Sequence, residues 1–521
     1  MHHSQRVWVV KLTSPRRCIT FDHIGAQHGG IVAIVASSEP LQEARRARGK
    51  ALRQHAPRGL HAEVGHVDRD PIGLLKINSA GRVERLIPLR YGRMLESPFA
   101  FFRGSAILQA HDLAGTPHSG IVQQICGDCH VANFGGFATP ERALLLDVND
   151  FDETSEGPWE WDLKRLVASF VVAARHLRHS RATADALVRQ VTCSYRDRMA
   201  MYGDMGILDT WYDHITFERL LNEADDPETQ RRIRRGMERA ADRTHVALLP
   251  KLGTQVNGRW HILDAPPAVF HVRGNQTLFA ADDDWMTFKN VDAAINKFYA
   301  DYLTTLAPDR RQLLSHFTRH DIAFKVVGVG SVGTRCLIQL MIDSHGKPLF
   351  LQIKEAGQSV VARYFKAGAK ARHATAGKRA ANGAGAVHEG RRVVEGQRLM
   401  QAASDLFLGW AKGPSGRCFY LRQLRDMKLS PQLELMDATL LGKYAAVCGW
   451  VLARAHAKAG GQAAEISGYL GTSDRMADAL VAYANVYADQ VERDYARFVD
   501  VCRKGELPAR NDEDMAAEFR V

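Results

Sequence analysis

The sequence predicts an α+β protein, and three stretches with different residue patterns support that prediction. After Asp162, apolar residues recur at helical spacing, and helical patterns dominate to about residue 320. From Ala323 to Leu424 the chain is β-rich, with apolar runs separated by turns that contain glycine. Two long helical patterns, over about 432–457 and 474–499, then close the chain.

The composition is that of a globular protein. The 521 residues are enough for a large core and two or three structural units. Hydrophobic residues make up 45% of the chain, yet no apolar run approaches the roughly 18 residues that a membrane span needs. We therefore expect a cytoplasmic protein that makes no membrane contact.

The net charge of +11 is concentrated in part of the chain. Between Arg363 and Arg392 basic residues alternate with alanine and glycine, and Glu389 is the single acid. This pattern predicts a solvated insertion near 366–386, with a polyanion contact as the alternative. It lacks the interleaved aromatic residues on which bases stack, which disfavours nucleic-acid binding.

The eight cysteines predict reduced structural thiols. Cys126 and Cys129 form the one C-x-x-C, and a zinc site would need a second pair at suitable spacing, which the sequence lacks. A redox dithiol remains the alternative interpretation of this pair.

Four segments are expected along the chain: a basic, poorly ordered leader over 1–60, a catalytic region with a helical insertion over 61–320, a nucleotide-binding region over 321–430, and C-terminal helices over 431–521 that pack on the catalytic region. Within the second segment, the aromatic residues between Ser97 and Ser105 are expected in the core. Arg103 beside them is a candidate phosphate contact.

The most informative block places Asp and Asn at the ends of consecutive short apolar segments. It runs GDCHVAN over Gly127–Asn133, NDFD over Asn149–Asp152 and WDL over Trp161–Leu163. One carboxylate can take a hydroxyl proton, and two oxygen ligands can hold Mg²⁺ on a nucleotide. The block resembles the catalytic loop and metal motif of aminoglycoside-phosphotransferase-type kinases. The spacing agrees, because 162 − 150 = 12 and the family separates its metal Asp from the Asp of its D-L pair by about as much.

The resemblance implies roles for individual residues. Asp128 would orient or deprotonate the acceptor hydroxyl, and Asn133 and Asp150 would hold Mg²⁺, with Asp147 and Asp152 as alternatives to Asp150. Asp162 is expected to be a buried structural carboxylate at a helix N-terminus.

Two neighbouring residues complete the predicted loop. For His130 we favour a scaffolding hydrogen bond over direct chemistry. Cys126 stands where the family has a histidine, so a supporting hydrogen bond of the loop is missing or replaced.

The β-rich region resembles the small lobe of a kinase-like fold. Gly328, Gly330 and Gly333 spell G-x-G-x-x-G between two predicted strands, where glycine lets backbone N–H groups approach phosphates. Lys354 ends the next strand, from which an ammonium would reach the phosphates of a nucleotide. Glu395 on the following helix is its candidate partner, with Glu389 as the substitute. The turn at 425–426 would be the hinge beside adenine.

A Rossmann-type interpretation of the same glycines stays open. In it, Gly333 opens a helix over Thr334–Ile342 and Glu355 binds a ribose hydroxyl. The lack of a polar helical face in 334–342 favours the kinase-type loop.

In kinases the catalytic loop follows the small lobe, whereas here it comes before it. A circular permutation explains this order, and it is tolerable because domain termini tend to lie close together at the surface. The chain also resembles a bacterial family catalogued as domain of unknown function 2252, over roughly residues 41 to 510. The stretches that carry this resemblance are Phe101–Gly104, Gly127–Asn133, Val326–Arg335 and Val394–Arg398. The insertion near 366–386 departs from that family's pattern.

The expected fold is thus a circularly permuted, kinase-like two-lobe fold with a mostly helical large lobe and a small antiparallel β-rich lobe. The expected function is ATP- and Mg²⁺-dependent phosphoryl transfer to an unknown hydroxyl acceptor, contacted somewhere in 180–320. The alternatives are a catalytically inactive nucleotide-binding or scaffolding relative, and a Rossmann-type oxidoreductase.

Overall fold

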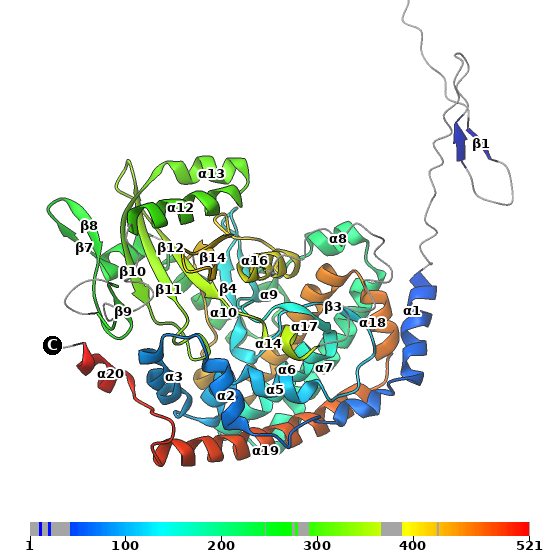
Figure 1. Ribbon diagram of the computed structural model, residues 1–521. Coiled ribbons are helices and arrows are strands. Elements are labelled where there is room, and N and C mark those ends of the chain that lie inside the picture. The colour runs from blue at the N-terminus through cyan, green and yellow to red at the C-terminus, as the bar shows by residue number, and fades with distance from the viewer. Residues whose placement is uncertain are drawn as a thin grey trace, which may run out of the picture.

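The computed structural model describes residues 10–12, 19–21, 42–244, 246–272, 277–279, 291–365, 388–424 and 427–519. It joins a large helical region to a six-stranded antiparallel sheet, with the sheet at the upper left of Figure 1 and the helices below and to the right. This confirms the predicted α+β class. The predicted basic insertion near 366–386 and the predicted hinge at 425–426 lie outside the described residues.

The six-stranded sheet has the order β13-β14-β12-β11-β10-β9. Its strands are β9 (Val269–Phe270), β10 (Phe317–Lys325), β11 (Cys336–Asp343), β12 (Pro348–Ala356), β13 (Gly409–Lys412) and β14 (Cys418–Gln423). Every neighbouring pair is antiparallel. The sequence therefore predicted most of this sheet, except that β10 begins six residues earlier than Ala323 and β9 joins its edge.

Both faces of the sheet are apolar because successive side chains point to opposite sides. Phe324, Leu337 and Met341 pack with Phe519 on one face, whereas residues such as Ala323 pack into a second cluster. The helices α12 (Val291–Thr304), α13 (Pro308–Ser315) and α16 (Glu389–Met400) contact the strands. The terminal helix α20 (Asp512–Glu518) lies beside α3 (Ile87–Met94), as the red and blue ribbons of Figure 1 show.

The helical region forms around α7 (Arg181–Asp204) and α17 (Ala438–Gly460), which pack against each other. The other principal helices are α6 (Trp159–His176), α18 (Ala463–Leu470) and α19 (Arg475–Arg503), and α19 runs along the bottom of Figure 1. Their apolar residues share one large cluster with Phe101 and Phe102 of α4 (Pro98–Gly104). The aromatic residues near Ser97 are thus core residues, as predicted.

Two small antiparallel pairs are separate from the six-stranded sheet. They join β3 (Val122–Ile125) to β6 (Ser155–Pro158), and β4 (Phe134–Ala138) to β5 (Leu144–Val148). The chain also returns from the sheet at this place, because Leu429 and Gly136 exchange backbone hydrogen bonds of 2.9 Å. Segments far apart in the sequence therefore meet at one seam.

The remaining elements are short and complete the helical region and the edge of the sheet. They are β1 (Val10–Leu12), β2 (Ile19–Phe21), α2 (Pro71–Ser79), α5 (Ala106–Leu113), α8 (Ile207–Tyr212), α9 (Phe217–Glu223), α10 (Pro227–Ala241), α11 (Leu249–Leu252), β7 (Gly253–Val256), β8 (Arg259–Ile262) and α14 (Val360–Tyr364).

The predicted irregular leader is wrong from residue 42 onward. Helix α1 (Gln42–Ala51) packs on α18, and Arg45 binds Glu465 through its Nε at 3.0 Å. The sequence pattern concealed this helix because most of its residues are polar or charged, and it is held by partners more than 400 positions away.

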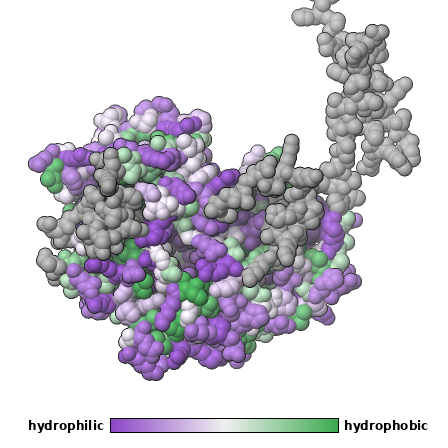
Figure 2. All heavy atoms as spheres, in the orientation of Figure 1, coloured by the Kyte–Doolittle hydropathy of each residue, from purple (hydrophilic) through white to green (hydrophobic). Residues whose placement is uncertain are grey.

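No helix within the described ranges is long and apolar enough to cross a membrane. The face of the molecule in Figure 2 is predominantly hydrophilic, and its hydrophobic residues gather in small separate groups.

Candidate active site

Two cavities meet between the helical region and the sheet. The larger has a volume of about 670 Å³ and the smaller about 330 Å³. Both are lined by Arg103, Asn133, Asp150, Gly328 and Ser331, which mark the junction between them. The predicted catalytic loop and the predicted glycine loop thus face the same space, one from each side.

The floor of the junction is the loop from Cys126 to Asn133, which Asp162 at the start of α6 holds from below. Its two carboxylate oxygens each accept a backbone N–H, from Cys126 and from Gly127, at 2.8 Å. Gly127 has φ +84°, and a Cβ there would stand 2.1 Å from the carbonyl oxygen of Glu153. Asp162 is therefore the buried structural carboxylate that the sequence predicted, and only glycine fits at 127.

Asp162 also contacts a histidine from another element. His456 on α17 lies 3.1 Å from Asp162 through Nε2 and 2.8 Å from the hydroxyl of Tyr195 through Nδ1. Both His456 and Asp162 are buried. The sequence does not reveal this contact because His456 lies 294 positions after Asp162.

Asp128 lines the smaller cavity. Its Oδ1 accepts a hydrogen bond from Nε of Arg165 at 2.8 Å, and Arg165 is held in turn by Gln109 and by the carbonyl of Phe102. Burial raises the pKa of Asp128 above its usual value, although Arg165 and Arg103 oppose that shift. The carboxylate is thus fixed in place and is a stronger base than an exposed aspartate.

Asn133 and Asp150 lie together at the junction. The side-chain Nδ2 of Asn133 donates to the backbone carbonyl of Asp128 at 2.6 Å, which orients the amide. Burial and the nearby Asp152 raise the pKa of Asp150, whereas Lys354 and Arg422 oppose the shift. A carboxylate and an amide oxygen are ligands that Mg²⁺ accepts together with phosphate oxygens.

The described residues contain no group of three or more His, Cys, Asp or Glu side chains arranged to hold a metal ion.

The two alternatives to Asp150 behave differently. Asp147 is fully buried, pairs with Arg454 at 2.9 Å and accepts the backbone N–H of Ala402, and it lines neither cavity. Asp152 lines the smaller cavity and accepts from the Tyr420 hydroxyl at 2.8 Å. Asp147 is thus part of the buried core, whereas Asp152 lines the smaller cavity together with Asp150.

The roof of the junction is the glycine loop between β10 and β11. Gly328 and Gly333 have φ of +62° and +84°, which favours glycine at both positions. Arg82 donates to the carbonyl oxygens of Gly330 and Val332 at 2.7 Å, and Arg93 donates to that of Gly328 at 2.7 Å. These arginines come from the helical region and bind the loop's carbonyl groups.

The Rossmann-type interpretation of this loop is wrong. Residues 336–343 form strand β11, which pairs antiparallel with β10 and β12, so no helix follows Gly333. Glu355, the proposed ribose ligand, pairs instead with Arg335 and Arg417.

Lys354 lies near the end of β12 and lines the larger cavity. Its ammonium pairs with Asp152, 202 positions earlier in the chain. Although burial opposes its charge, Asp150 and Asp152 hold the pKa of Lys354 well above its usual value. The ammonium is therefore charged and faces the predicted metal ligands.

The predicted partnership of Lys354 with Glu395 is not formed. Glu395 lies on the exposed side of α16 and pairs with Arg391 at 2.7 Å. Its substitute Glu389 pairs with Arg392, whose guanidinium reaches the carbonyl oxygens of Asp152 and Thr154. The side of α16 on which each glutamate lies decides these ion pairs, and the charge pattern of the sequence does not show that side.

The larger cavity is strongly basic. Among the described residues that line it, seven side chains are basic and two are acidic: Arg103, Arg142, Lys251, Lys325, Lys354, Arg422 and Lys428 against Asp150 and Asp405. The carboxylate of Asp405 accepts hydrogen bonds from the backbone N–H groups of Phe407 and Gln423, at 2.7 and 2.6 Å. Such a cavity favours a polyanionic ligand.

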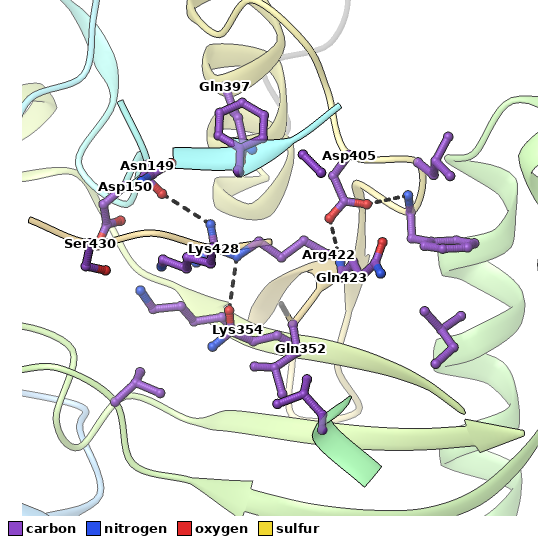
Figure 3. A pocket seen from close by; sticks show the side chains of 18 of the residues that line it. Asn149, Asp150, Gln352, Lys354, Gln397, Asp405, Arg422, Gln423, Lys428 and Ser430 are labelled. Carbon is purple, nitrogen blue, oxygen red and sulfur yellow. Dashed lines mark hydrogen bonds between the residues drawn. The ribbon is translucent and has the colours of Figure 1, made fainter. Parts of the chain in front are cut away.

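Arg422 is a site residue that the sequence analysis did not single out. It lies on β14, and its guanidinium donates to the side-chain oxygen of Gln352 at 3.0 Å and to the backbone carbonyl of Asn149 at 3.3 Å. Figure 3 shows that it connects the sheet to the segment that carries Asn149 and Asp150. Its position two residues after Tyr420 on one strand face is the signal that could have revealed it.

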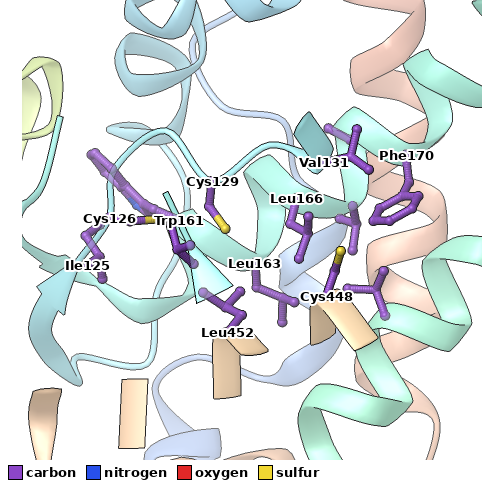
Figure 4. Close-up of a cluster of buried hydrophobic side chains, with 14 of the residues drawn as sticks. Ile125, Cys126, Cys129, Val131, Trp161, Leu163, Leu166, Phe170, Cys448 and Leu452 are labelled. Carbon is purple, nitrogen blue, oxygen red and sulfur yellow. The ribbon is translucent and has the colours of Figure 1, made fainter. Parts of the chain in front are cut away.

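The C-x-x-C pair lies in the core. Cys126 and Cys129 are buried free thiols, surrounded in Figure 4 by residues such as Leu163 and Trp161. Burial raises the pKa of both thiols, which disfavours the reactive thiolate. The geometry therefore supports structural thiols over a redox dithiol.

One family model matches the chain. Residues 82–501 match the uncharacterized protein family conserved in bacteria called DUF2252, and the chain therefore belongs to it. No curated protein and no solved structure matches the sequence.

Proposed function

We propose that this member of DUF2252 is an ATP- and Mg²⁺-dependent phosphotransferase on a circularly permuted, kinase-like fold. The observation that carries the proposal is the junction of the two cavities. There Asn133 and Asp150 face the glycine loop, with Asp128 on the side of the smaller cavity and Lys354 on the side of the larger one. These are the parts that phosphoryl transfer requires.

The order of elements supports a permuted small lobe. A hairpin with a glycine loop, a third strand that carries the lysine, a helix and a further hairpin come in the order β10, β11, β12, α16, β13 and β14, with the short helix α14 between β12 and α16. Kinases use the same sequence of parts, with the lysine on the third strand.

The helix that would precede the catalytic loop in a kinase is α17. It contacts that loop region although it follows it in the chain. His456 binds Asp162, and the Tyr444 hydroxyl donates to the carbonyl of Val131 at 3.0 Å. A permuted chain order with a conserved spatial arrangement explains both contacts.

The larger cavity is the donor site in this proposal. Lys354 and the N–H groups of Gly328 and Ser331, the loop residues at the junction, bind the nucleotide phosphates. Asn133 and Asp150 would hold Mg²⁺, which neutralises phosphate charge when bound. Lys354 keeps its contact with Asp152 and binds the phosphates through its other N–H groups, and Arg422 adds a second positive charge from β14.

Transfer then needs little covalent work from the protein. The acceptor oxygen forms a bond to the γ-phosphorus while the bond from that phosphorus to the β,γ-bridging oxygen breaks, and ADP leaves. Asp128 takes the proton that the acceptor hydroxyl loses. Positioning and neutralisation of charge supply most of the rate enhancement in such a reaction.

Nucleotide binding tests the donor site directly. We expect ATP with Mg²⁺ to raise the melting temperature of the wild-type protein, because saturation at 100 times Kd stabilises the folded state by about 2.7 kcal/mol. Asp150→Asn should abolish the Mg²⁺-dependent part of the shift. Asp301→Asn is the matched control, since Asp301 lies on the exposed face of α12 and pairs only with Lys297 in the described structure.

Turnover tests the role of Asp128. Asp128→Asn should keep the ATP-dependent shift and lose phosphate transfer or ATP hydrolysis by about 10²-fold or more. Nucleotide binding without turnover in the wild-type protein would favour the non-catalytic relative, and a shift with NAD alone would contradict the donor site.

A further inference from the structure

The residues that line the smaller cavity distinguish it from the proposed donor site. Asp128 and His130 line it and not the larger cavity, whereas Lys354 lines only the larger one. With the donor phosphates at Lys354, an acceptor hydroxyl that reaches Asp128 has to come from the smaller cavity. Its volume of about 330 Å³ suits a small molecule.

Three arginines line this cavity without a carboxylate partner in the described part of the chain. Arg82 donates only to backbone carbonyl groups, and Arg363 on α14 is exposed and makes no side-chain hydrogen bond or ion pair. Arg103 lies at the junction, and its Nε is buried without a hydrogen-bond partner. Arg103 and Arg363 thus have hydrogen-bonding capacity left for an anionic ligand.

Most carboxylates of the cavity already have cationic partners. The pairs are Asp128 with Arg165, Asp152 with Lys354, and Glu355 with Arg417. Glu153 accepts the backbone N–H of Val360, and burial raises its pKa to about 7, so it carries only part of a charge near neutral pH. Asp150 remains, and it is the proposed ligand of a divalent cation.

A second unsatisfied group points to a bound ligand. The side chain of His130 is 5% exposed, lines the cavity, and has its Nδ1 buried without a partner. A neutral imidazole can exchange a hydrogen bond with a ligand hydroxyl.

We infer that the smaller cavity is the acceptor site and that its substrate is a small hydroxyl compound carrying an anionic group, either phosphate or carboxylate. This inference rests on the proposed function. Arg103 and Arg363 bind the anionic group, and the hydroxyl lies against Asp128 and His130. Arginine suits this task because its planar guanidinium binds phosphate or carboxylate through two parallel hydrogen bonds.

Binding of simple probes tests the inference on the full chain. The donor site is first saturated with Mg²⁺ and a non-hydrolysable ATP analogue, and glycerol 3-phosphate, glycerate and glycerol are then titrated by calorimetry. We expect one or both anionic probes to bind at least about tenfold more tightly than glycerol, since one charge-assisted hydrogen bond raises the binding affinity by about that factor. The two anionic probes distinguish phosphate from carboxylate recognition.

Arg363→Gln is the informative variant, because the exposed side chain has no partner whose loss would unfold the protein. It should weaken the anionic probe about tenfold and leave binding of the ATP analogue unchanged. Arg391→Gln is the matched control, since Arg391 is an exposed arginine on α16 that lines neither cavity.

The outcomes separate the two proposals. Equal binding of glycerol and both anions, no probe binding, or equal affinity in wild type and Arg363→Gln would overturn the acceptor inference while the ATP analogue still binds. Failure of the ATP analogue itself would overturn the proposed function instead.

Discussion

The floor and the roof of the junction hold their polar groups by different means. On the floor, Asp162 accepts hydrogen bonds from two backbone N–H groups and contacts His456, and in the core Asp147 pairs with Arg454. The four side chains are buried. On the roof, the glycine loop makes its cross-region contacts through carbonyl groups bound by Arg82 and Arg93. The floor is thus fixed by buried carboxylates, whereas a few arginines hold the roof.

The difference indicates how the site would work. Buried carboxylates with complete sets of partners keep the catalytic loop in one geometry before any ligand arrives, as electrostatic catalysis requires. Under the proposed function, the roof would gain contacts when some of its N–H groups bind phosphates. Substitutions on the floor should therefore cost stability, and those on the roof should cost affinity.

The largest effect is expected for Asp162→Ala. It leaves the N–H groups of Cys126 and Gly127 and the ring of His456 without their acceptor, and should lower the free energy of unfolding by about 3–5 kcal/mol. Urea denaturation followed by circular dichroism measures this. Asp301→Ala removes an exposed ion pair and should stay within about 0.5 kcal/mol. Wild-type stability in Asp162→Ala would show that the floor is not held in this way.

A smaller effect is expected on the roof. Gly328→Ala places a Cβ on backbone with φ +62°, where no other atom lies within 4 Å, so the cost is backbone strain of about 1–2 kcal/mol. Gly346→Ala is the matched control, because Gly346 has φ +74° and equally open surroundings in the turn between β11 and β12. Both variants should lose similar stability, and only Gly328→Ala should weaken binding of ATP. Equal ATP affinity in both would remove the loop from the donor site.

The smallest effect is expected at the edge of the sheet. His271 lies 2.8 Å from Asp264 and 3.0 Å from Asp321, and the hydrogen bond with Asp321 raises its pKa to about 9. Because the folded-state pKa exceeds the unfolded value of about 6.5, this stabilisation is complete below pH 6.5 and is lost as the pH rises through 9. The melting temperature should fall over that range, and His271→Gln should reduce the fall. An unchanged slope in the variant would exclude His271 as the cause.

Local patterns revealed much of this molecule because the relevant residues are close in sequence. Apolar runs separated by a turn that contains glycine predicted β11 and β12, and the glycines between β10 and β11 predicted their loop. The block from Gly127 to Asp162 was recognisable because its oxygen-bearing side chains end short segments at regular spacing. Each of these signals lies within a few dozen residues.

The errors involve partners that are distant in the chain. Lys354 pairs with Asp152 rather than Glu395, and α1 forms against α18 although its own residues are mostly charged. Asp147 and Asp150 look alike in the sequence, yet one lies fully buried against Arg454 and the other opens into both cavities.

The residues alone thus indicate the α+β class, most strands of the sheet, and the set of Asp, Asn, Gly and Lys residues at the junction. Only the tertiary structure decides which carboxylate pairs with which cation, and that Arg103, Arg363 and His130 share a second cavity. The physical reason is that hydrophobic periodicity and turn chemistry act over a few residues. Ion pairing and burial depend instead on side-chain positions that distant segments create together.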